Sequence, residues 1–352
     1  MAVRPRTVRF GSLALESDGG GGVSTYAREL IAAMVPVLPV AELSATVQKS
    51  AAGLLPARVR PIPVRDCRGL RRASVTKFSV DRVDLLHALD VDLPLVGSRR
   101  TVATIHDLAV FDVPWAFSKA KAVGERLFVK DTLRRADVLI AVSDFTAERI
   151  HDACGRDAVV TPLAPASWAV PAADQAVAAV RAKYALPDQF VLQIGTVEPR
   201  KQAHLVAAAA REVGLPCVLA GLGSTGPNAP AGTVGLGYVD LEELPALYGA
   251  ATIVAYASVY EGFGLPPVEA MACGATVVAS AVGALPDVVD QGAVLVSRPR
   301  TEDWVAAFRD LAWDPDARQQ LRQRGRKEMA NLTWARTAEL TAAAYQAAGL
   351  CV

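Results

Sequence analysis

Short apolar runs alternate with amphipathic helical patterns along this chain of 352 residues. A series of strands separated by helices forms parallel sheets that helices cover on both faces. The chain is also longer than a single hydrophobic core usually supports. The pattern therefore predicts an α/β protein with two domains. The candidate strands are Thr7–Leu15, Asp84–Ala88, Thr101–Ile105, Val138–Val142, Val159–Leu163, Phe190–Ile194, Cys217–Ala220, Ile253–Ala257 and Thr276–Ala279.

A proline-rich connector separates two series of strands and helices. Pro162, Pro165 and Pro171 lie in it, and the second series begins near Phe190. We therefore expect a first domain at residues 1–168 and a second at 188–333. The tail, residues 334–352, is expected to contain a final amphipathic helix.

Composition excludes several classes of protein. With 52% hydrophobic and 21% charged residues, the chain is typical of a packed protein and not of a disordered one. A net charge of +1 gives no reason to expect a nucleic-acid partner. The five cysteines are odd in number and form no C-x-x-C, which predicts reduced thiols without zinc or disulfides. Neither a secretory signal nor an apolar run of ~18 residues is present, so we expect a cytoplasmic protein.

Basic residues gather in two stretches of the first half, Arg65 to Lys77 and Lys119 to Arg135. A solvated helix face is the commoner meaning of such a pattern. Basic helices with apolar neighbours also bind anionic membranes. Peripheral contact with the inner face of a membrane is therefore a second interpretation.

The segment Val259–Ser280 carries the strongest functional signal. Gly262, Phe263, Gly264 and Leu265 follow Glu261, and two prolines then suit the first turn of a helix, where a missing N–H costs little. We expect Glu269 in that first turn, Gly274 at the end of the helix, and a buried strand after it. Backbone amides leading into a helix N-terminus can bind an anion. Two carboxylates beside such a site predict a ligand with phosphate and hydroxyl groups, such as a sugar nucleotide.

Two cations follow another predicted strand. Gly195 ends the strand, and Arg200 and Lys201 stand where the next helix begins. Open α/β sheets bind ligands at the carboxyl ends of their strands, where two cations can clamp a pyrophosphate. Exposed basic pairs are common, so the pair alone would be weak evidence.

Strand ends in the first half supply further candidates. Gly21 and Gly22 belong to a glycine run before a helix expected from Ser24, and they would let backbone approach a ligand closely. His106 follows the strand Thr101–Ile105 directly. His87 is similarly placed, although a lone histidine is more often structural.

The segment Gly221–Gly226 matches G-x-G-x-x-G after a strand. Pro227 and Pro230 follow where a dinucleotide site requires a helix. We predict a loop there and no nicotinamide cofactor.

In combination these motifs resemble glycosyltransferase family 4, the retaining glycosyltransferases of GT-B fold that carry a Glu–seven–Glu motif, here Glu261 and Glu269. The resemblance covers nearly the whole chain. Its other parts are Gly21-Gly22, Thr104-Ile105-His106-Asp107, Arg134-Arg135-Ala136-Asp137 to Ala141-Val142-Ser143, Gly195 to Lys201, Gly237-Tyr238-Val239 and Ala284-Leu285-Pro286-Asp287. It implies two Rossmann-like domains that face each other across a cleft. The C-terminal domain would bind the nucleotide sugar and the N-terminal domain the acceptor, with the last helix crossing back.

The resemblance also implies a role for each candidate residue. Arg200 and Lys201 would neutralise the donor pyrophosphate, and the amides of residues 262–265 would hold phosphate and sugar. Glu269 would bind the ribose hydroxyls and Glu261 the transferred sugar. His106 would line the anomeric centre, while Gly21 and Gly22 would approach the diphosphate.

Two positions depart from the family pattern. Thr196 replaces an arginine that many members carry, so the cationic role falls on Arg200 and Lys201. Asp287 replaces a glutamate, which leaves one acid at a helix start shorter.

The expected reaction moves a hexose from a nucleoside diphosphate sugar to a hydroxyl of a glycan, lipid-linked or small-molecule acceptor. The form of the segment Gly195–Lys201 resembles a branch with many mannosyltransferases, which favours GDP-mannose over UDP-sugars. Two side-chain cations make a metal unnecessary, and we expect neither metal nor cofactor. The alternatives are a sugar-nucleotide epimerase or a phosphorylase of related fold, and a catalytically inactive sugar-nucleotide-binding protein.

Overall fold

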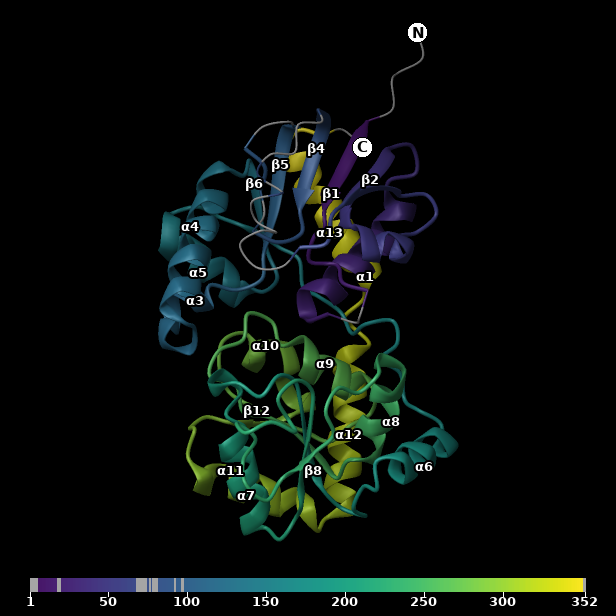
Figure 1. Cartoon of the computed structure of the whole chain (residues 1–352), viewed down its shortest axis with the longest axis vertical. Helices are drawn as coiled ribbons and strands as arrows, with labels where there is room; N and C mark the ends of the chain where they lie inside the picture. Colours follow the sequence, from purple (N-terminus) through teal and green to yellow (C-terminus); the bar gives the residue numbers. More distant parts are fainter. Residues whose placement is uncertain are drawn as a thin grey trace. The chain divides into compact units, whose positions relative to one another are not determined.

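The computed structural model describes residues 6–17, 20–67, 75, 77, 82–91, 93–95 and 98–350 (Figure 1). The chain divides into two compact units, which we call unit 1 (Met1–Leu163 with Thr333–Val352) and unit 2 (Ala164–Leu332). Within the described ranges we find no helix whose length and apolar character would let it traverse a lipid bilayer.

Unit 1 contains a sheet of seven parallel strands in the order β3-β2-β1-β4-β5-β6-β7. The strands are β1 Thr7–Gly11, β2 Glu42–Gln48, β3 Arg60–Val64, β4 Val83–Ala88, β5 Ser98–Ile105, β6 Val138–Ala141 and β7 Val159–Val160. The helices are α1 Gly22–Val37, α3 Ala109–Asp112, α4 Lys119–Arg135, α5 Asp144–Cys154 and α13 Trp334–Ala347, with 3-10 turns η1 Lys49–Leu54 and η2 Pro114–Ala116.

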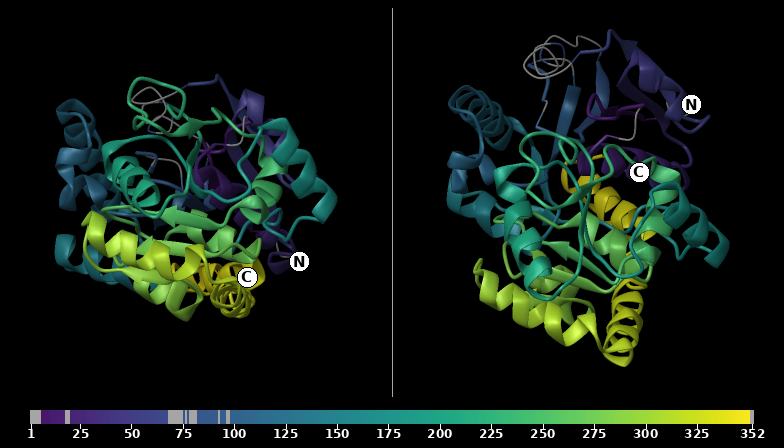
Figure 2. Two further views of the ribbon diagram at one scale, coloured as in Figure 1. Left: turned by 90° about the horizontal axis from the view of Figure 1, so that it is seen from below. Right: turned by 60° about the horizontal axis from the view of Figure 1, so that its bottom comes forward.

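Helices cover both faces of this sheet. Successive side chains of a strand point to opposite faces, so the contacts of neighbouring residues show which helices cover each face. Ala103 and Ile105 of β5 belong to a buried cluster with α4 and α5. Thr104, which lies between them, is hydrogen-bonded to Tyr26 of α1 instead. Helix α13, drawn in yellow, lies against α1 and also contacts β6 and β7 (Figures 1 and 2). The last helix of the chain is thus part of the core of unit 1.

Unit 2 contains a sheet of six parallel strands in the order β10-β9-β8-β11-β12-β13. The strands are β8 Val191–Ile194, β9 Cys217–Ala220, β10 Val234–Gly235, β11 Ile253–Tyr256, β12 Val277–Ser280 and β13 Val294–Val296. The helices are α6 Asp174–Lys183, α7 Ala203–Glu212, α8 Leu244–Ala250, α9 Leu265–Ala272, α10 Leu285–Val289, α11 Thr301–Ala312 and α12 Pro315–Met329, with 3-10 turns η3 Pro199–Lys201, η4 Leu241–Glu243 and η5 Asp290–Gly292.

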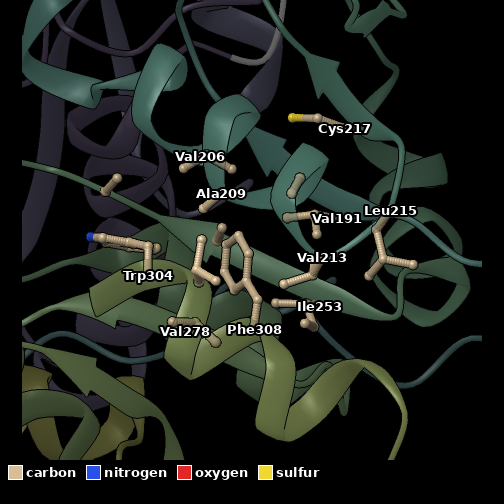
Figure 3. Packing of buried hydrophobic residues seen from close by; sticks show 14 of the residues in the cluster. Val191, Val206, Ala209, Val213, Leu215, Cys217, Ile253, Val278, Trp304 and Phe308 are labelled. Carbon is tan, nitrogen blue, oxygen red and sulfur yellow. The ribbon is translucent and has the colours of Figure 1, made fainter. Parts of the chain in front are cut away.

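The core of unit 2 lies on both sides of its sheet. On one side, Trp304 and Phe308 of α11 pack with α7 over Val191, Ile253 and Val278 (Figure 3). Their rings meet edge to face with centroids 5.8 Å apart, the geometry that aromatic pairs favour. The intervening strand residues, among them Leu192, Val254 and Val277, are also fully buried. The opposite face is therefore covered as well, and α9 there contacts both β12 and α12.

Several sequence expectations are confirmed, and others need correction. A strand forms in each expected apolar run, and residues 221–226 form a loop. The expectation that the first strand runs to Leu15 was wrong, because the chain turns where the Leu15 amide donates to the Ser12 carbonyl. Helix α1 begins at Gly22 and not at Ser24, because the Gly21 carbonyl accepts the amides of Ser24 and Thr25.

Candidate active site

The candidate cations of unit 2 lie beside one of the candidate glutamates. Lys201 ends η3, which follows β8, and Glu261 follows β11, the neighbouring strand. The Lys201 ammonium forms an ion pair with Glu261 Oε1. Ser258 Oγ donates to the same oxygen at 2.6 Å and lies 3.3 Å from Lys201 Nζ. The three side chains form one cluster, in which the lysine and glutamate are 16% and 13% exposed.

Backbone geometry fixes the turn that carries the cations. Gly195 has φ +133° directly after β8, and Gln202 closes η3 in the left-handed region at φ +43°. The Gln193 side-chain amide donates to the Lys201 carbonyl at 2.6 Å. The Val259 amide donates to the Arg200 carbonyl at 3.0 Å, which joins the two strand-end loops. The backbone carbonyls of both Arg200 and Lys201 are therefore held by hydrogen bonds.

The Arg200 guanidinium stands at the edge of this cluster. It donates to the Tyr260 carbonyl at 3.2 Å and to Glu198 Oε1 at 3.0 Å. Its side chain is 21% exposed. Two positive charges thus lie in the loop that follows β8, beside the loop that follows the neighbouring strand β11, at the edge where open α/β sheets bind ligands.

The cluster keeps Glu261 ionised. Burial raises the pKa of its carboxyl, but the charges of Lys201 and Arg200 and the hydrogen bonds from Lys201 and Ser258 outweigh burial. The pKa of Glu261 therefore lies below its ordinary value. At neutral pH this side chain is a carboxylate that accepts hydrogen bonds.

A glycine loop connects Glu261 to helix α9. Gly264 caps the helix at φ +93°, and a Cβ there would lie 2.2 Å from Leu285 Cδ2. Pro266 and Pro267 occupy the second and third helical positions and carry no N–H. The unpaired amide donors at the start of the helix must therefore come from Leu265 and the loop before it, ahead of the prolines.

Glu269 lies deeper in the helix than the sequence indicated. The helix begins at Leu265, so Glu269 is its fifth residue and belongs to the second turn, and the expectation of the first turn was wrong. The residue is only 7% exposed. Burial, with a smaller contribution from the Glu269 charge, raises the pKa of Tyr256 and of Tyr248, whose hydroxyls are 3.0 Å apart. Glu269 is thus a buried carboxylate near a tyrosine pair.

The unit 1 candidates lie at the end of β5 and at the start of α1. His106 follows β5 and is half-buried, and its Nε2 lies 2.8 Å from the Leu89 carbonyl. Gly21 and Gly22 are exposed at the start of α1, and a Cβ at Gly21 would meet nothing within 4 Å. Asp18 and Gly19 of the same glycine run lie outside the described residues. The space beside Gly21 is therefore open, whereas a Cβ at Gly20 would lie 2.5 Å from Ser24 Cβ.

His87 is a structural histidine. It is fully buried, and both ring nitrogens have partners, Tyr345 Oη at 2.8 Å and Thr104 Oγ1 at 2.8 Å. Burial, with a smaller contribution from His106, lowers the pKa of His87 to about 3. The ring is therefore neutral at physiological pH.

Comparison with known proteins identifies the family. The family model described as "Glycosyl transferases group 1" matches residues 178–328. O-antigen chain mannosyltransferase B of Escherichia coli is 33% identical over 272 residues, 70% of this chain and 70% of that protein. The chain belongs to the group 1 glycosyltransferases. D-inositol 3-phosphate glycosyltransferase of Actinosynnema mirum is 32% identical over 283 residues, which cover 72% of this glycosyltransferase and 66% of the relative.

Solved structures agree on the fold of this glycosyltransferase. Sucrose-phosphate synthase from Thermosynechococcus elongatus has a TM-score of 0.76 at 21% identity, over 97% of this chain and 98% of that one. HepE from Anabaena, solved with UDP and glucose, has a TM-score of 0.73 at 17% identity, over 97% of this chain and 100% of that one. The expected α/β GT-B fold, with two Rossmann-like units that each hold a parallel sheet, is confirmed.

One side chain of the cluster was not singled out from the sequence. Ser258 is 1% exposed and lies two residues beyond β11. Serine is too common for its type to give a signal, but its place at a strand end, three residues before Glu261, could have marked it. The described residues include no group of three or more His, Cys, Asp or Glu side chains arranged to hold a metal ion.

Proposed function

We propose that this glycosyltransferase transfers a hexosyl group from a nucleoside diphosphate sugar to a hydroxyl of a glycan, lipid-linked or small-molecule acceptor, with retention of configuration. The observation that carries the proposal is the cluster of Lys201, Glu261 and Ser258 beside Arg200, at the carboxyl ends of β8 and β11. It combines fixed positive charge for a diphosphate with an ionised carboxylate for a sugar.

The leaving nucleoside diphosphate gains negative charge as the glycosidic bond breaks. Arg200, Lys201 and the amides of residues 262–265 would stabilise that charge, and removal of one such donor costs about 3–4 kcal/mol in comparable sites. We assign the sugar hydroxyls to Glu261 and the ribose hydroxyls to Glu269. Gly195 would let the donor approach the end of β8.

We assign donor binding to unit 2 and acceptor binding to unit 1. Within unit 1, His106 would act on the reacting sugar, and Gly21 and Gly22 would approach the diphosphate. The Nε2–H of His106 donates to the Leu89 carbonyl, since a carbonyl only accepts, and whenever the ring carries a single proton Nδ1 is therefore an acceptor. A sugar or acceptor hydroxyl is the group that Nδ1 can bind.

Relatives support two candidate donors. The mannosyltransferase from Escherichia coli favours a mannosyl donor, and GDP-mannose is our first choice. The HepE structures hold UDP or UDP-glucose, which makes a UDP-sugar the second choice. The two fixed cations supply the charge that a metal would, so we propose metal-independent transfer without a cofactor.

The proposal is tested by mixing the enzyme with GDP-mannose or UDP-glucose and an acceptor mixture, with and without EDTA. We expect acceptor-dependent release of nucleoside diphosphate that persists in excess chelator. A nucleoside diphosphate at 100 times its dissociation constant should stabilise the protein by about 2.7 kcal/mol in a thermal-shift assay. Stabilisation without release would indicate an inactive binding protein, and donor conversion without acceptor would indicate an epimerase. Activity that EDTA abolishes and Mg²⁺ restores would contradict metal independence.

We further propose that unit 1 contacts an anionic membrane through η2 and α4. Trp115, Val123 and Leu127 are 64%, 58% and 64% exposed. Lys119 and Lys130 on the same helix are also exposed. Exposed apolar side chains among lysines favour a lipid surface with negative charge. Residues 68–74 and 76 of the other basic stretch lie outside the described residues.

Vesicle sedimentation tests the membrane proposal. The protein should bind vesicles with phosphatidylglycerol and not vesicles of phosphatidylcholine alone. Trp115→Ser with Leu127→Ser should weaken binding at least tenfold, whereas Trp313→Ser, at an equally exposed tryptophan of unit 2, should not. Equal binding by both variants would contradict this surface.

A further inference from the structure

Four buried side chains form a continuous hydrogen-bonded chain inside unit 1. Tyr345 Oη of α13 lies 2.8 Å from His87 Nδ1, and His87 Nε2 lies 2.8 Å from Thr104 Oγ1. Thr104 Oγ1 lies 2.7 Å from Tyr26 Oη. All four residues have 0% exposure. The chain links α13, β4, β5 and α1, which are distant in sequence.

The chemistry of the groups couples these bonds to one another. A neutral imidazole has one donor and one acceptor nitrogen, and each hydroxyl has a single hydrogen to donate. If Tyr345 donates to His87, then His87 donates to Thr104, and the Thr104 hydroxyl can either donate to Tyr26 or accept from it. If instead Thr104 donates to His87, then Tyr26 must donate to Thr104 and His87 to Tyr345. The tautomer of His87 therefore decides the donor in the bonds to both of its partners, and loss of the Thr104 hydroxyl removes the hydrogen bonds to His87 and to Tyr26 together.

The chain ends against His106. The Tyr26 ring meets the His106 ring edge to face, with centroids 4.8 Å apart and planes at 81°. The Tyr26 ring also lies 6.2 Å from Trp334, the first residue of α13. Thr104 and His106 are two residues apart, so an extended chain points both side chains the same way. Both ends of helix α13 are thus connected to the Tyr26 ring that packs against His106. Trp334 lies near that ring directly, and Tyr345 is linked to it through the hydrogen-bonded chain.

We propose that Tyr26, Thr104, His87 and Tyr345 are positioning residues that hold the His106 ring, through the Tyr26 ring, in the orientation in which Nε2–H donates to the Leu89 carbonyl. A ring released from this orientation would lose the bond to Leu89 and with it the preference for one tautomer. The C-terminal helix is then part of the catalytic apparatus as well as of the core. The inference rests on the proposed function in that His106 acts on the reacting sugar. A small displacement of a reacting group can lower a rate by orders of magnitude, so a loosened His106 should lower kcat.

The test compares Thr104→Val with Thr104→Ser, which keeps the hydroxyl. Thr132→Val is the matched control, because Thr132 is also fully buried in unit 1 and donates to the Val91 carbonyl. We expect Thr104→Val to lower kcat about tenfold, which corresponds to about 1.4 kcal/mol. Its donor dissociation constant should stay within about twofold of the parent's. Thr104→Ser and Thr132→Val should keep kcat within about twofold.

Nitrogen-15 spectra of the histidine rings give a readout that needs no substrate. The parent and Thr104→Ser should show His106 as the Nε2–H tautomer, and Thr104→Val should show a tautomer mixture. An unchanged His106 tautomer in Thr104→Val overturns the inference, with or without transferase activity in the parent. Equal losses of kcat in Thr104→Val and Thr132→Val, in proportion to their losses of Tm, also overturn it. Absence of transfer by the parent itself would overturn the proposed function instead.

Discussion

The pair of Lys201 and Glu261 is the central feature at the scale of single residues. Two charges removed from water are costly unless each has a partner, and here each satisfies the other. A bound diphosphate would compete with Glu261 for the Lys201 ammonium. Ser258 could then keep the carboxylate partnered, since its hydroxyl already donates to Oε1. The cluster therefore suits a site that exchanges one anion for another.

The lowered pKa of Glu261 makes a prediction about stability and pH. A carboxyl whose pKa is lower in the folded state stabilises the fold fully above its unfolded value, about 4.3. That stability is lost as the pH falls through the folded-state pKa. Glu261→Gln should therefore lose about 3–5 kcal/mol of unfolding free energy at pH 7. In urea unfolding, the gap from the parent should stay constant from pH 7 to about 5 and narrow only in more acidic solution.

Glu302→Gln on α11 is the control for this measurement, because Glu302 is exposed. It should unfold like the parent at each pH. A gap for Glu261→Gln that narrows between pH 7 and 5 would contradict the lowered pKa.

The two glutamates should fail differently on substitution. Contacts to ribose change little during transfer, so Glu269→Gln should mainly raise the donor dissociation constant. Contacts to the transferred sugar strengthen as its ring gains positive charge, so Glu261→Gln should mainly lower kcat, by about tenfold or more. Donor affinity by calorimetry and turnover at saturating donor separate the effects. Parent-like binding and turnover in both variants would refute the site. If Glu261→Gln lowers only donor affinity and Glu269→Gln only kcat, the two glutamates have the opposite roles.

At the scale of elements, two glycines hold the Glu261 loop in place. Gly283 has φ +57°, and a Cβ there would lie 2.1 Å from the Glu261 carbonyl oxygen. That carbonyl accepts the Ala284 amide at 3.0 Å. A Cβ at Gly264 would also be too close to a neighbour, but it would meet the end of the Leu285 side chain and no backbone atom. The clash of a Cβ at Gly283 with the Glu261 backbone should therefore disturb the loop more than the clash at Gly264 with a side chain.

Alanine substitutions test this ranking. Gly283→Ala should displace Glu261 and lower kcat by more than tenfold, and Gly264→Ala should have a smaller effect. Gly232→Ala is the control, since Gly232 also has positive φ, at +79°, but open space around its Cβ. It should cost only the conformational strain of about 1–2 kcal/mol and leave kcat unchanged. Equal turnover by Gly283→Ala and Gly232→Ala would show that the loop tolerates the shift.

The elements also show what the sequence could predict. Strands β8, β9, β11 and β12 are buried on both faces, and all their residues except Gln193 and Ser280 are hydrophobic, so the sequence predicted them as apolar strands. Strand β2 has serine, threonine and glutamine on buried positions, and β3 contains Pro61 and Pro63, so neither was predicted. Strands β10 and β13 were not predicted either, although β7, which is as short as β10, was.

Some features of the candidate site could likewise be predicted from the sequence, and others could not. Arg200, Lys201 and Glu261 could be predicted as candidates because chemistry-bearing residues stood at predicted strand ends. The depth of Glu269 and the role of Ser258 could not. The first depends on Leu265 starting the helix ahead of the prolines, and the second on a side-chain contact that leaves no pattern in the sequence.

At the scale of the whole molecule, the chain returns to unit 1 after completing unit 2. Helix α13 belongs to unit 1, where it contacts α1, β6 and β7. Tyr345, Ala338 and Ala344 of this helix are fully buried, as are Leu30 and Ile31 of α1. Unit 1 therefore requires both ends of the chain, whereas unit 2 is formed from one continuous segment.

Truncation after residue 332 should consequently weaken unit 1 alone. Loss of α13 would expose the buried side of α1 and leave His87 without Tyr345, while the cores around Trp304 and the Lys201 cluster keep all their contacts within unit 2. Hydrogen exchange measured by mass spectrometry should rise in peptides from α1 and β4–β6 and stay unchanged in peptides from β8, β9 and β11. The truncated chain should still bind nucleoside diphosphate, if unit 2 is the donor-binding unit, but should not transfer sugar. Faster exchange throughout β8–β12 would show instead that unit 2 depends on unit 1 for its stability.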